Sequence, residues 1–390
     1  MDIKKEVEKR SNYIIRLRKH FHKHPELSLK EYETSKRIRE ELTTMEIPYI
    51  MAGETGVIGF VGHGERVIAL RADMDALPIE EKTVVDYKSV NEGVMHACGH
   101  DAHVAALLGA ADILKANEDQ LSCTIKLIFQ PSEENCMGAK MLTEQGFVDD
   151  VEEIYGLHVF ADIPCGQISI QSGPRMAASD IFHITLHGHS GHAGKPQQCV
   201  DATLAAAATI VNLQSIISRE LDPNRSAVVT VGAVHSGSAH NIISGEAKID
   251  GTVRTFELED CKLIEHSLKR IVQNTAETYH ATATIDYQRS LHPVVFNDEE
   301  VTRKALEEAK KVFPDRMFVD IPRLFLGEDF STYQQTIPGT FAFVGAGNEQ
   351  LGRAFPNHHN KFNIDEKAVL HATALYVAFG LAGGKTVDKA

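Results

Sequence analysis

The first part of the chain, to about residue 180, alternates between two hydrophobic patterns. Apolar residues recur at a loose helical period over about 6–22, and a second helix is expected near 31–44. The Ala- and Leu-rich segment 102–115 also predicts a helix. Short apolar runs predict strands at 57–61, 67–70, 123–129 and 155–159. Strands that alternate with helices indicate an α/β domain, in which functional sites lie at the ends of strands.

The pattern changes near residue 182. Phe182 to Gly188 alternates with period two, as expected of a half-exposed strand. The elements that follow are a helix at about 201–219, strands at 227–233 and 247–255, a helix at about 261–277 and a strand at 281–286. This β-α-β-β-α-β order favours a small α+β, ferredoxin-like domain. We therefore expect one larger domain in two parts, 1–181 and 294–390, which ends on a helix at 366–380, and an inserted small domain at 182–293.

Length, composition and charge are consistent with a globular protein of two domains. A chain of 390 residues is too long for one ordinary core, and its 43% hydrophobic and 24% charged residues are typical of folded domains. Its apolar runs fall short of the roughly 18 to 20 residues that span a bilayer. The start of the chain is polar and unlike a signal peptide. We therefore predict a cytoplasmic protein with no membrane partner. The formal charge of −14 also disfavours nucleic acid as a partner.

The densest group of candidate metal ligands is Met95–His103, where five potential ligands fall within eight residues. Cys98 and His100 flank Gly99, and side chains two residues apart point the same way in extended chain. The glycine allows a sharp turn between them. The six cysteines follow no disulfide spacing, so they are expected to be free thiols or ligands. The alternative, a polar loop in which Asp101 caps the next helix, explains Asp101 but leaves the histidines and Cys98 unexplained.

Carboxylates follow two of the predicted strands. Glu133 and Glu134 come directly after the strand at 123–129, and adjacent side chains of extended chain face opposite ways. One carboxylate can therefore bind metal while the other acts as the base for a metal-activated water. Asp73 and Asp75 end another strand, where carboxylates often orient a ligand histidine from behind.

Two histidine segments are weaker signals when taken alone. His158 is a lone histidine in an apolar strand, and such residues are more often satisfied core residues than ligands. The segment 357–360, Asn-His-His-Asn, is equally well explained as an exposed loop. Both gain weight only when they are considered together with the groups above.

These five segments, in this order, resemble the M20 family of metallopeptidases. The similarity is to its amidohydrolase branch, with aminoacylase-like, hippurate-hydrolase-like and auxin-conjugate-hydrolase-like members. It covers nearly the whole chain from His20 to the last helix, and Met-His-Ala-Cys-Gly-His-Asp at 95–101 is its most specific motif. Further matches are Gly191-His192-Ala193, Asn241-Ile242-Ile243, Gly251 to Thr255 and Gly327 to Phe330. The resemblance implies a zinc-peptidase-like catalytic domain, a mixed sheet flanked by helices, with an inserted ferredoxin-like small domain.

Carried over position by position, the resemblance implies two divalent metal ions per subunit. Zinc and manganese are favoured, with cobalt and nickel as alternatives, because a soft thiolate suits zinc while carboxylates tolerate manganese. Cys98 would lie nearest both ions, and Glu133 would be the general base. The other metal ligands would be His100, Glu134, His158 and His358. His358 is preferred to His359 because Phe362 then follows four residues later, as in the family.

The resemblance also implies roles for the small domain. His192 and Asn241 match residues that bind substrate and stabilise the oxyanion in the family. Because relatives dimerise through this domain, a homodimer is expected, and His192 would then serve the partner's active site. Arg254 would form an ion pair with a substrate carboxylate, although a structural ion pair is equally consistent with its position.

Together these observations predict an enzyme that hydrolyses N-acyl amino acids, or similar small amides, to a carboxylic acid and an amine. A di- or aminopeptidase of the same metal class is the nearest alternative. A metal- or ligand-binding protein that has lost catalysis is a second alternative, and the retention of Glu133 and Glu134 argues against it. A purely structural metal site is a third, but such zinc sites are closed and four-coordinate. Five candidate ligands with a free carboxylate fit an open catalytic site better.

Overall fold

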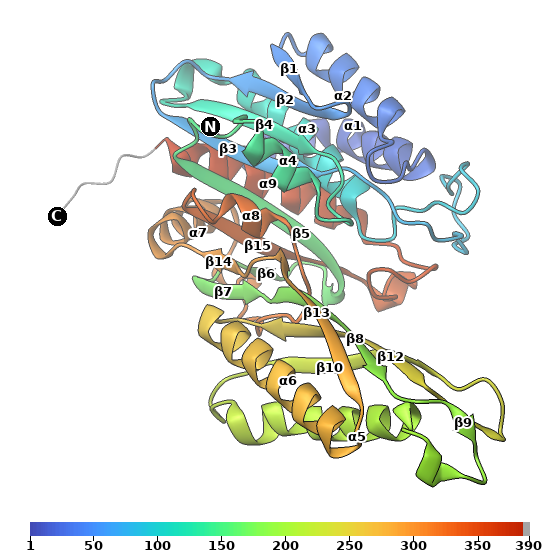
Figure 1. Ribbon diagram of the computed structural model, residues 1–390. Helices are drawn as coiled ribbons and strands as arrows, with labels where there is room; N and C mark the ends of the chain where they lie inside the picture. The colour runs from blue at the N-terminus through green and yellow to red at the C-terminus, as the bar shows by residue number, and fades with distance from the viewer. Residues whose placement is uncertain (385–390) are drawn as a thin grey trace. The chain divides into compact units, whose positions relative to one another are not determined.

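The computed structural model describes residues 1–384, except for the side chains of residues 290 and 291. The chain divides into two compact units (Figure 1). Unit 1 comprises Met1–Arg175, Val295–Pro322 and the chain from Glu328 onward. Unit 2 comprises Met176–Val294 and Arg323–Gly327. Each unit has a hydrophobic core of its own.

A mixed seven-stranded sheet runs through unit 1. In spatial order its strands are β1 (Tyr49–Ala52), β2 (Gly56–Val61), β4 (Thr124–Gln130), β3 (Val67–Asp73), β5 (Glu153–Pro164), β15 (Gly339–Gly347) and β6 (Ile168–Ser169). The four central strands β4, β3, β5 and β15 are parallel, and the outer strands pair antiparallel. Buried parallel strands need apolar side chains on both faces, which explains the continuous apolar runs in the sequence.

Helices cover this sheet. They are α1 (Ile3–Lys23), α2 (Tyr32–Thr44), α3 (His100–Lys115), α4 (Gly138–Glu144), α7 (Glu299–Val312), α8 (Phe330–Tyr333) and α9 (Glu366–Gly383). α3 packs between α1 and α9, and α9 also packs on β3, β5 and β15 (Figure 1). α3 is buried along almost its whole length, which its small and apolar side chains permit. A separate two-stranded sheet pairs β7 (Gly173–Met176) with β14 (Val295–Asn297).

Unit 2 is built on a four-stranded antiparallel sheet. In spatial order its strands are β10 (Val228–Ser236), β12 (Glu246–Thr255), β8 (Ala178–His187) and β13 (Thr282–His292). Helices α5 (Ala202–Ser215) and α6 (Leu258–Thr278) pack against each other and against this sheet. The strands of a short ribbon, β9 (Gly191–His192) and β11 (Ile242–Ile243), pair beside them. Along the chain the main elements follow the order β-α-β-β-α-β.

The large mixed sheet with its helices confirms the predicted α/β fold class. Some boundaries differ from those expected. The helix predicted to continue to residue 219 ends at Ser215, because Ile216–Glu220 forms a π-helical turn. The strand predicted at 281–286 extends to His292 in β13. Among the helices of residues 1–384, none combines the length and apolarity needed to cross a bilayer.

Candidate metal centre

The parallel strands of unit 1 bring the predicted carboxylates to one edge of the sheet. β3 ends at Asp73, which lies in register with Gln130 at the end of β4. Asp75 therefore follows one strand end and Glu133 follows its neighbour. β5, on the other side of β3, carries His158. Ends of adjacent parallel strands are where α/β sheets place their sites.

The loop before α3 delivers Cys98 and His100. Gly99 is the N-cap of α3 and has a φ of 100°, a conformation that side chains rarely adopt. A Cβ at this position would lie 2.5 Å from Val159 Cγ2, so only glycine fits. The alternative role of Asp101 as the helix N-cap is wrong. Asp101 lies inside the first turn of α3, and its carboxylate accepts from His22 Nδ1 at 2.9 Å.

The five predicted ligands converge. Cys98 Sγ lies 3.4 Å from His158 Nε2 and 3.3 Å from His358 Nε2. Glu134 Oε1 lies 3.5 Å from His358 Nε2 and 4.0 Å from His100 Nε2. Cys98 thus stands at the centre of the group. His359 is not part of this group, because its ring stacks on Phe355 at 4.6 Å.

These residues fit a bound cation. Within the part of the chain that the structure describes, the buried atoms His100 Nε2 and Glu134 Oε1 have no hydrogen-bond partner. Buried polar atoms almost always have a partner. A cation bound between these two atoms would accept a lone pair from each of them. A set of one thiolate, imidazoles and carboxylates suits a borderline divalent ion such as zinc.

Asp75 holds this cluster from behind. Its two carboxylate oxygens accept the backbone N–H groups of Glu133 and Glu134, each at 3.1 Å. Ser28 Oγ donates to the same carboxylate at 2.6 Å. His100 Nδ1 donates to the backbone carbonyl of Asp75 at 2.9 Å, which leaves Nε2 free to face the ligand group.

A second carboxylate orients the neighbouring histidines. His103 Nδ1 donates to Asp73 Oδ1 at 2.5 Å, and His103 Nε2 accepts the N–H of Val159 at 3.0 Å. His158 Nδ1 donates to the carbonyl of Val159 at 2.8 Å, so its Nε2 points to Cys98 as a neutral ligand nitrogen. His103, which the sequence offered as a possible ligand, therefore lies behind the site.

Glu133 is buried next to further acids. Its carboxylate lies close to those of Glu328 and Asp329, and the backbone N–H of Asp329 donates to Glu133 Oε1 at 3.4 Å. Burial and then Glu328 raise the pKa of Glu133 well above its ordinary value. Burial also raises the pKa of Glu134 to about 7. A cation at this site would favour the ionised forms of both carboxylates.

Arg71 neutralises the other side of the acidic group. It is fully buried and lies 2.7 Å from both Asp73 Oδ2 and Asp329 Oδ1, and 3.0 Å from Glu328 Oε1. Its Nε donates to Gln130 Oε1 at 2.9 Å. A guanidinium with this many planar donors can hold several carboxylates at once.

The remaining predicted site residues lie in unit 2. His192 is exposed on β9 and pairs in register with Ile242 of β11, so Asn241 stands beside it. The backbone N–H of Ala193 donates to the carbonyl of Asn241 at 3.0 Å. Arg254, near the end of β12, donates to Thr252 Oγ1 and to the carbonyl of Val253. The structure therefore brings His192 and Asn241 together within this unit.

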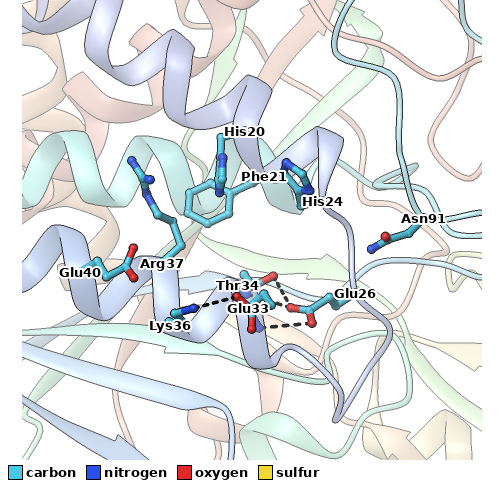
Figure 2. A pocket seen from close by; sticks show the side chains of 10 residues that line it. All are labelled: His20, Phe21, His24, Glu26, Glu33, Thr34, Lys36, Arg37, Glu40 and Asn91. Atoms are coloured by element: carbon cyan, nitrogen blue, oxygen red, sulfur yellow. Dashed lines mark hydrogen bonds and ion pairs between the residues drawn. The ribbon is translucent and has the colours of Figure 1, made fainter.

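A cavity of about 300 Å³ opens in unit 1 between the end of α1 and α2 (Figure 2). Its lining mixes both signs of charge, from Lys36 and Arg37 to Glu40. Glu26 on its wall accepts the backbone N–H of Thr34 at 2.8 Å and so caps the start of α2 (Figure 2). None of the predicted ligands lines this cavity, so it is distinct from the metal centre.

The model of Peptidase family M20/M25/M40 matches residues 69–381. The chain belongs to this family. The match confirms the resemblance seen in the motifs, and it identifies the chain as a hydrolase, as predicted. It spans the whole ligand group from Cys98 to His358.

Relatives cover nearly the full length of this M20 chain. An IAA-amino acid hydrolase, ILR1-like 4, of Arabidopsis thaliana is 39% identical over 94% of this chain and 84% of that protein. N-acetyl-L-cysteine deacetylase of Bacillus subtilis is 40% identical over 92% of this chain and 85% of that protein. The crystal structure of a dinuclear metal-binding M20 peptidase from Bacillus subtilis matches with a TM-score of 0.84 and 34% identity, over 96% of this chain and 98% of that one.

Several residues that shape this M20 site were not predicted from the sequence. Arg71 preceded a predicted pair of aspartates, but no local pattern marks an arginine as the partner of Asp329, 258 residues away. Asn357 lay in the segment considered as an exposed loop, yet its side chain bonds to the backbone of Cys98. An asparagine directly before a candidate ligand is the one local signal that would have drawn attention to it.

Proposed function

We propose that the chain is a metal-dependent amidohydrolase that cleaves N-acyl amino acids or similar small amides to a carboxylic acid and an amine. The observation that carries this proposal is the convergence of five ligand candidates, with two unpaired buried atoms, beside the buried carboxylate of Glu133. The names of two relatives support the substrate class, since one is an IAA-amino acid hydrolase and the other a deacetylase of N-acetyl-L-cysteine.

Two divalent ions per subunit would be held by this cluster. Cys98 would contribute to both because it lies at the centre of the group. The other ligands would be His100, Glu134, His158 and His358. When bound, such ions polarise a carbonyl group and lower the pKa of water from about 15.7 towards about 7. We propose zinc or manganese, with cobalt and nickel as alternatives, and the thiolate of Cys98 favours zinc.

We propose that Glu133 moves the protons of the reaction. Its carboxylate is buried but carries no ligand role in this assignment, so it accepts the proton of the attacking water and passes it to the leaving nitrogen. The N–H of Asp329 and the clamp of Asp75 on its backbone hold it in place. A held carboxylate reacts without the reorganisation that a solvated one requires.

Unit 2 would complete the site. We propose that His192 and Asn241 bind the substrate and stabilise the oxyanion, a contribution of roughly 3 kcal/mol per donor in other hydrolases. Arg254 would pair with the substrate carboxylate or act as a structural ion pair.

We also propose a homodimer through unit 2, in which His192 serves the partner's site. The outer face of α5 supports this, because Leu204 and Val211 are 52% and 70% exposed.

We propose a cytoplasmic location for the protein. The six free cysteines and the net charge of −14 support a cytoplasmic enzyme with no nucleic-acid or membrane partner. A structural disulfide in protein isolated without reductant would argue against this location.

A di- or aminopeptidase is the alternative function. The family description and the name of the matching crystal structure both refer to peptidases, which supports it. The two functions differ in whether the substrate carries a free α-amine. A panel of N-acyl amino acids and dipeptides, assayed with metal-stripped protein reloaded with each divalent ion, separates them. Turnover of dipeptides alone would favour the alternative, and full turnover without metal would refute both.

Two substitutions in the same panel test the roles of the glutamates. Glu133→Gln should keep its metals but lose at least about 10² to 10⁴-fold in turnover, since the amide cannot accept a proton. Glu134→Gln should lose or weaken one metal site and recover partly at high metal concentration. The reverse pattern would exchange the two roles. Changes of only a few fold in both variants would refute a catalytic Glu pair.

A further inference from the structure

The side chain of Asn357 bonds to two distant segments that carry ligand candidates. Its Nδ2 donates to the carbonyl of Cys98 at 2.8 Å and to the carbonyl of Val159 at 3.2 Å. Its Oδ1 accepts the N–H of Ala161 at 3.3 Å. The next residue in the chain is His358. One amide therefore joins the loop before α3, strand β5 and the loop of the exposed ligand.

The carbonyl of Val159 links Asn357 to His158. That oxygen also accepts the Nδ1–H of His158 at 2.8 Å, and a carbonyl oxygen has lone pairs for both donors. The bond to Nδ1 fixes the tautomer of His158 and turns its Nε2 towards Cys98 Sγ. A shift of this carbonyl would turn the ring, so Asn357 holds the group that orients a ligand.

The backbone of His358 is unfavourable without such support. Its φ of 67° lies in the left-handed region, which a residue with a Cβ rarely adopts. A strained backbone persists where its surroundings over-determine it. The side chain of His358 is 54% exposed, so packing gives it little restraint. The N–H of His358 donates to the carbonyl of Ala97 at 2.8 Å. The hydrogen bonds of the neighbouring Asn357 side chain also hold this loop in place.

We propose that Asn357 is a positioning residue of the metal centre. Its amide sets the spacing of the ligand atoms of Cys98, His158 and His358. Cys98 Sγ lies 3.4 Å from His158 Nε2 and 3.3 Å from His358 Nε2. The inference rests on the proposed function, because the role of Asn357 is exerted on metal ligands. Asn357 bonds to backbone groups of the ligand segments, so it acts through the ligands.

Asn357→Asp tests this inference in the full-length protein. The aspartate keeps the shape and the oxygen that faces Ala161, but it has no N–H for the carbonyls of Cys98 and Val159. Asn360→Asp is the matched control, because it makes the same change in the same loop at a residue that engages Lys82 through its backbone carbonyl. The measurements are zinc stoichiometry, zinc affinity by chelator competition, the absorption spectrum of the cobalt-loaded protein and the thermal midpoint of the metal-free protein.

Asn357→Asp should bind at least one zinc ion about 10- to 100-fold more weakly, the range seen when groups behind a ligand are removed. Its cobalt spectrum should change and excess metal should restore part of the turnover, while the metal-free midpoint should fall by only a few degrees, the cost of the lost hydrogen bonds. Asn360→Asp should match the wild type throughout. Asn357→Ala should show the same loss and carries the test if the aspartate does not fold. Wild-type affinity and spectrum in the Asn357 variants would overturn the inference alone, whereas a wild-type chain that binds no metal would overturn the proposed function as well.

Discussion

Asp75→Asn should weaken the fold of unit 1 and the metal centre together. The carboxylate is buried and accepts the N–H groups of Glu133 and Glu134 with one oxygen each, both at 3.1 Å. An amide of the same shape has a single oxygen. Whichever way the amide turns, its NH₂ group faces one of these two N–H groups, because both donors are fixed backbone. Ser28 can rotate its hydroxyl and adapt.

The expected loss in the free energy of unfolding follows from the number of hydrogen bonds that the amide cannot make. One buried backbone donor loses its partner, which costs about 1–3 kcal/mol in the free energy of unfolding. The metal-free protein should show this loss in full, since no ion then holds the glutamates. Metal affinity should also fall about 10- to 100-fold, because the Asp75 carboxylate holds the backbone of Glu134 and lies 3.3 Å from Nδ1 of His100.

Urea unfolding of the metal-free protein measures the first effect, and chelator competition measures the second. Asp86→Asn is the control, since it makes the same change at an exposed carboxylate of the same unit. Surface changes of this kind usually stay within about 0.5 kcal/mol. An Asp75→Asn protein as stable as the control and with wild-type metal affinity would show that this carboxylate does not support the site.

Three further predictions concern unit 2. Burial and then Arg254 lower the pKa of His292 to about 4. Below pH 6.5 the folded state therefore binds fewer protons than the unfolded state. The contribution of His292 to the free energy of unfolding is complete above this pH and should fall by about 1–2 kcal/mol between pH 7 and 5. His292→Gln should flatten this part of the profile, and an unchanged slope in denaturant unfolding would contradict the assignment. In the proposed dimer, Val211→Asp should yield monomers in sedimentation, and mixed His192→Ala and Glu133→Gln subunits should regain activity. A wild-type monomer, or no recovery after verified exchange, would refute the dimer or the action of His192 across it.

The fold was predictable where the sequence pattern is local. α1 shows the helical period of its buried face, including Ile14, Leu17 and Phe21, and the predicted strands are continuous apolar runs. β15 was not predicted, because its glycines normally interrupt strands. The structure explains them as points of close approach, since a Cβ on Gly345 would lie 2.1 Å from the carbonyl oxygen of Pro164. That contact depends on a partner strand far away in the sequence, so no local pattern announces it.

The candidate site was predictable where its residues form local motifs, and it was not predictable where the contacts join residues far apart in the sequence. Cys98 and His100 form a local motif, and Glu133 with Glu134 marks a strand end. The sequence also allows Asp101 as a cap, because polar residues just before a helix usually cap it. Its partner His22 lies 79 residues away, and an ion pair at that distance leaves no local signature. The sequence therefore predicts ligand candidates well, and it predicts poorly the groups that hold them.

The two sides of the acidic cluster are neutralised in different ways. On one side Arg71 contacts Asp73, Glu328 and Asp329, and its charge is permanent because a guanidinium keeps its proton in proteins. On the other side burial raises the pKa values of Cys98 and Glu133 well above their ordinary values, which favours the neutral form of each group. A thiolate ligand and a carboxylate base are useful only as anions. In the proposed mechanism, a bound cation would therefore alter reactivity on the side that lacks the permanent charge, and Glu133 lies at the boundary between the two.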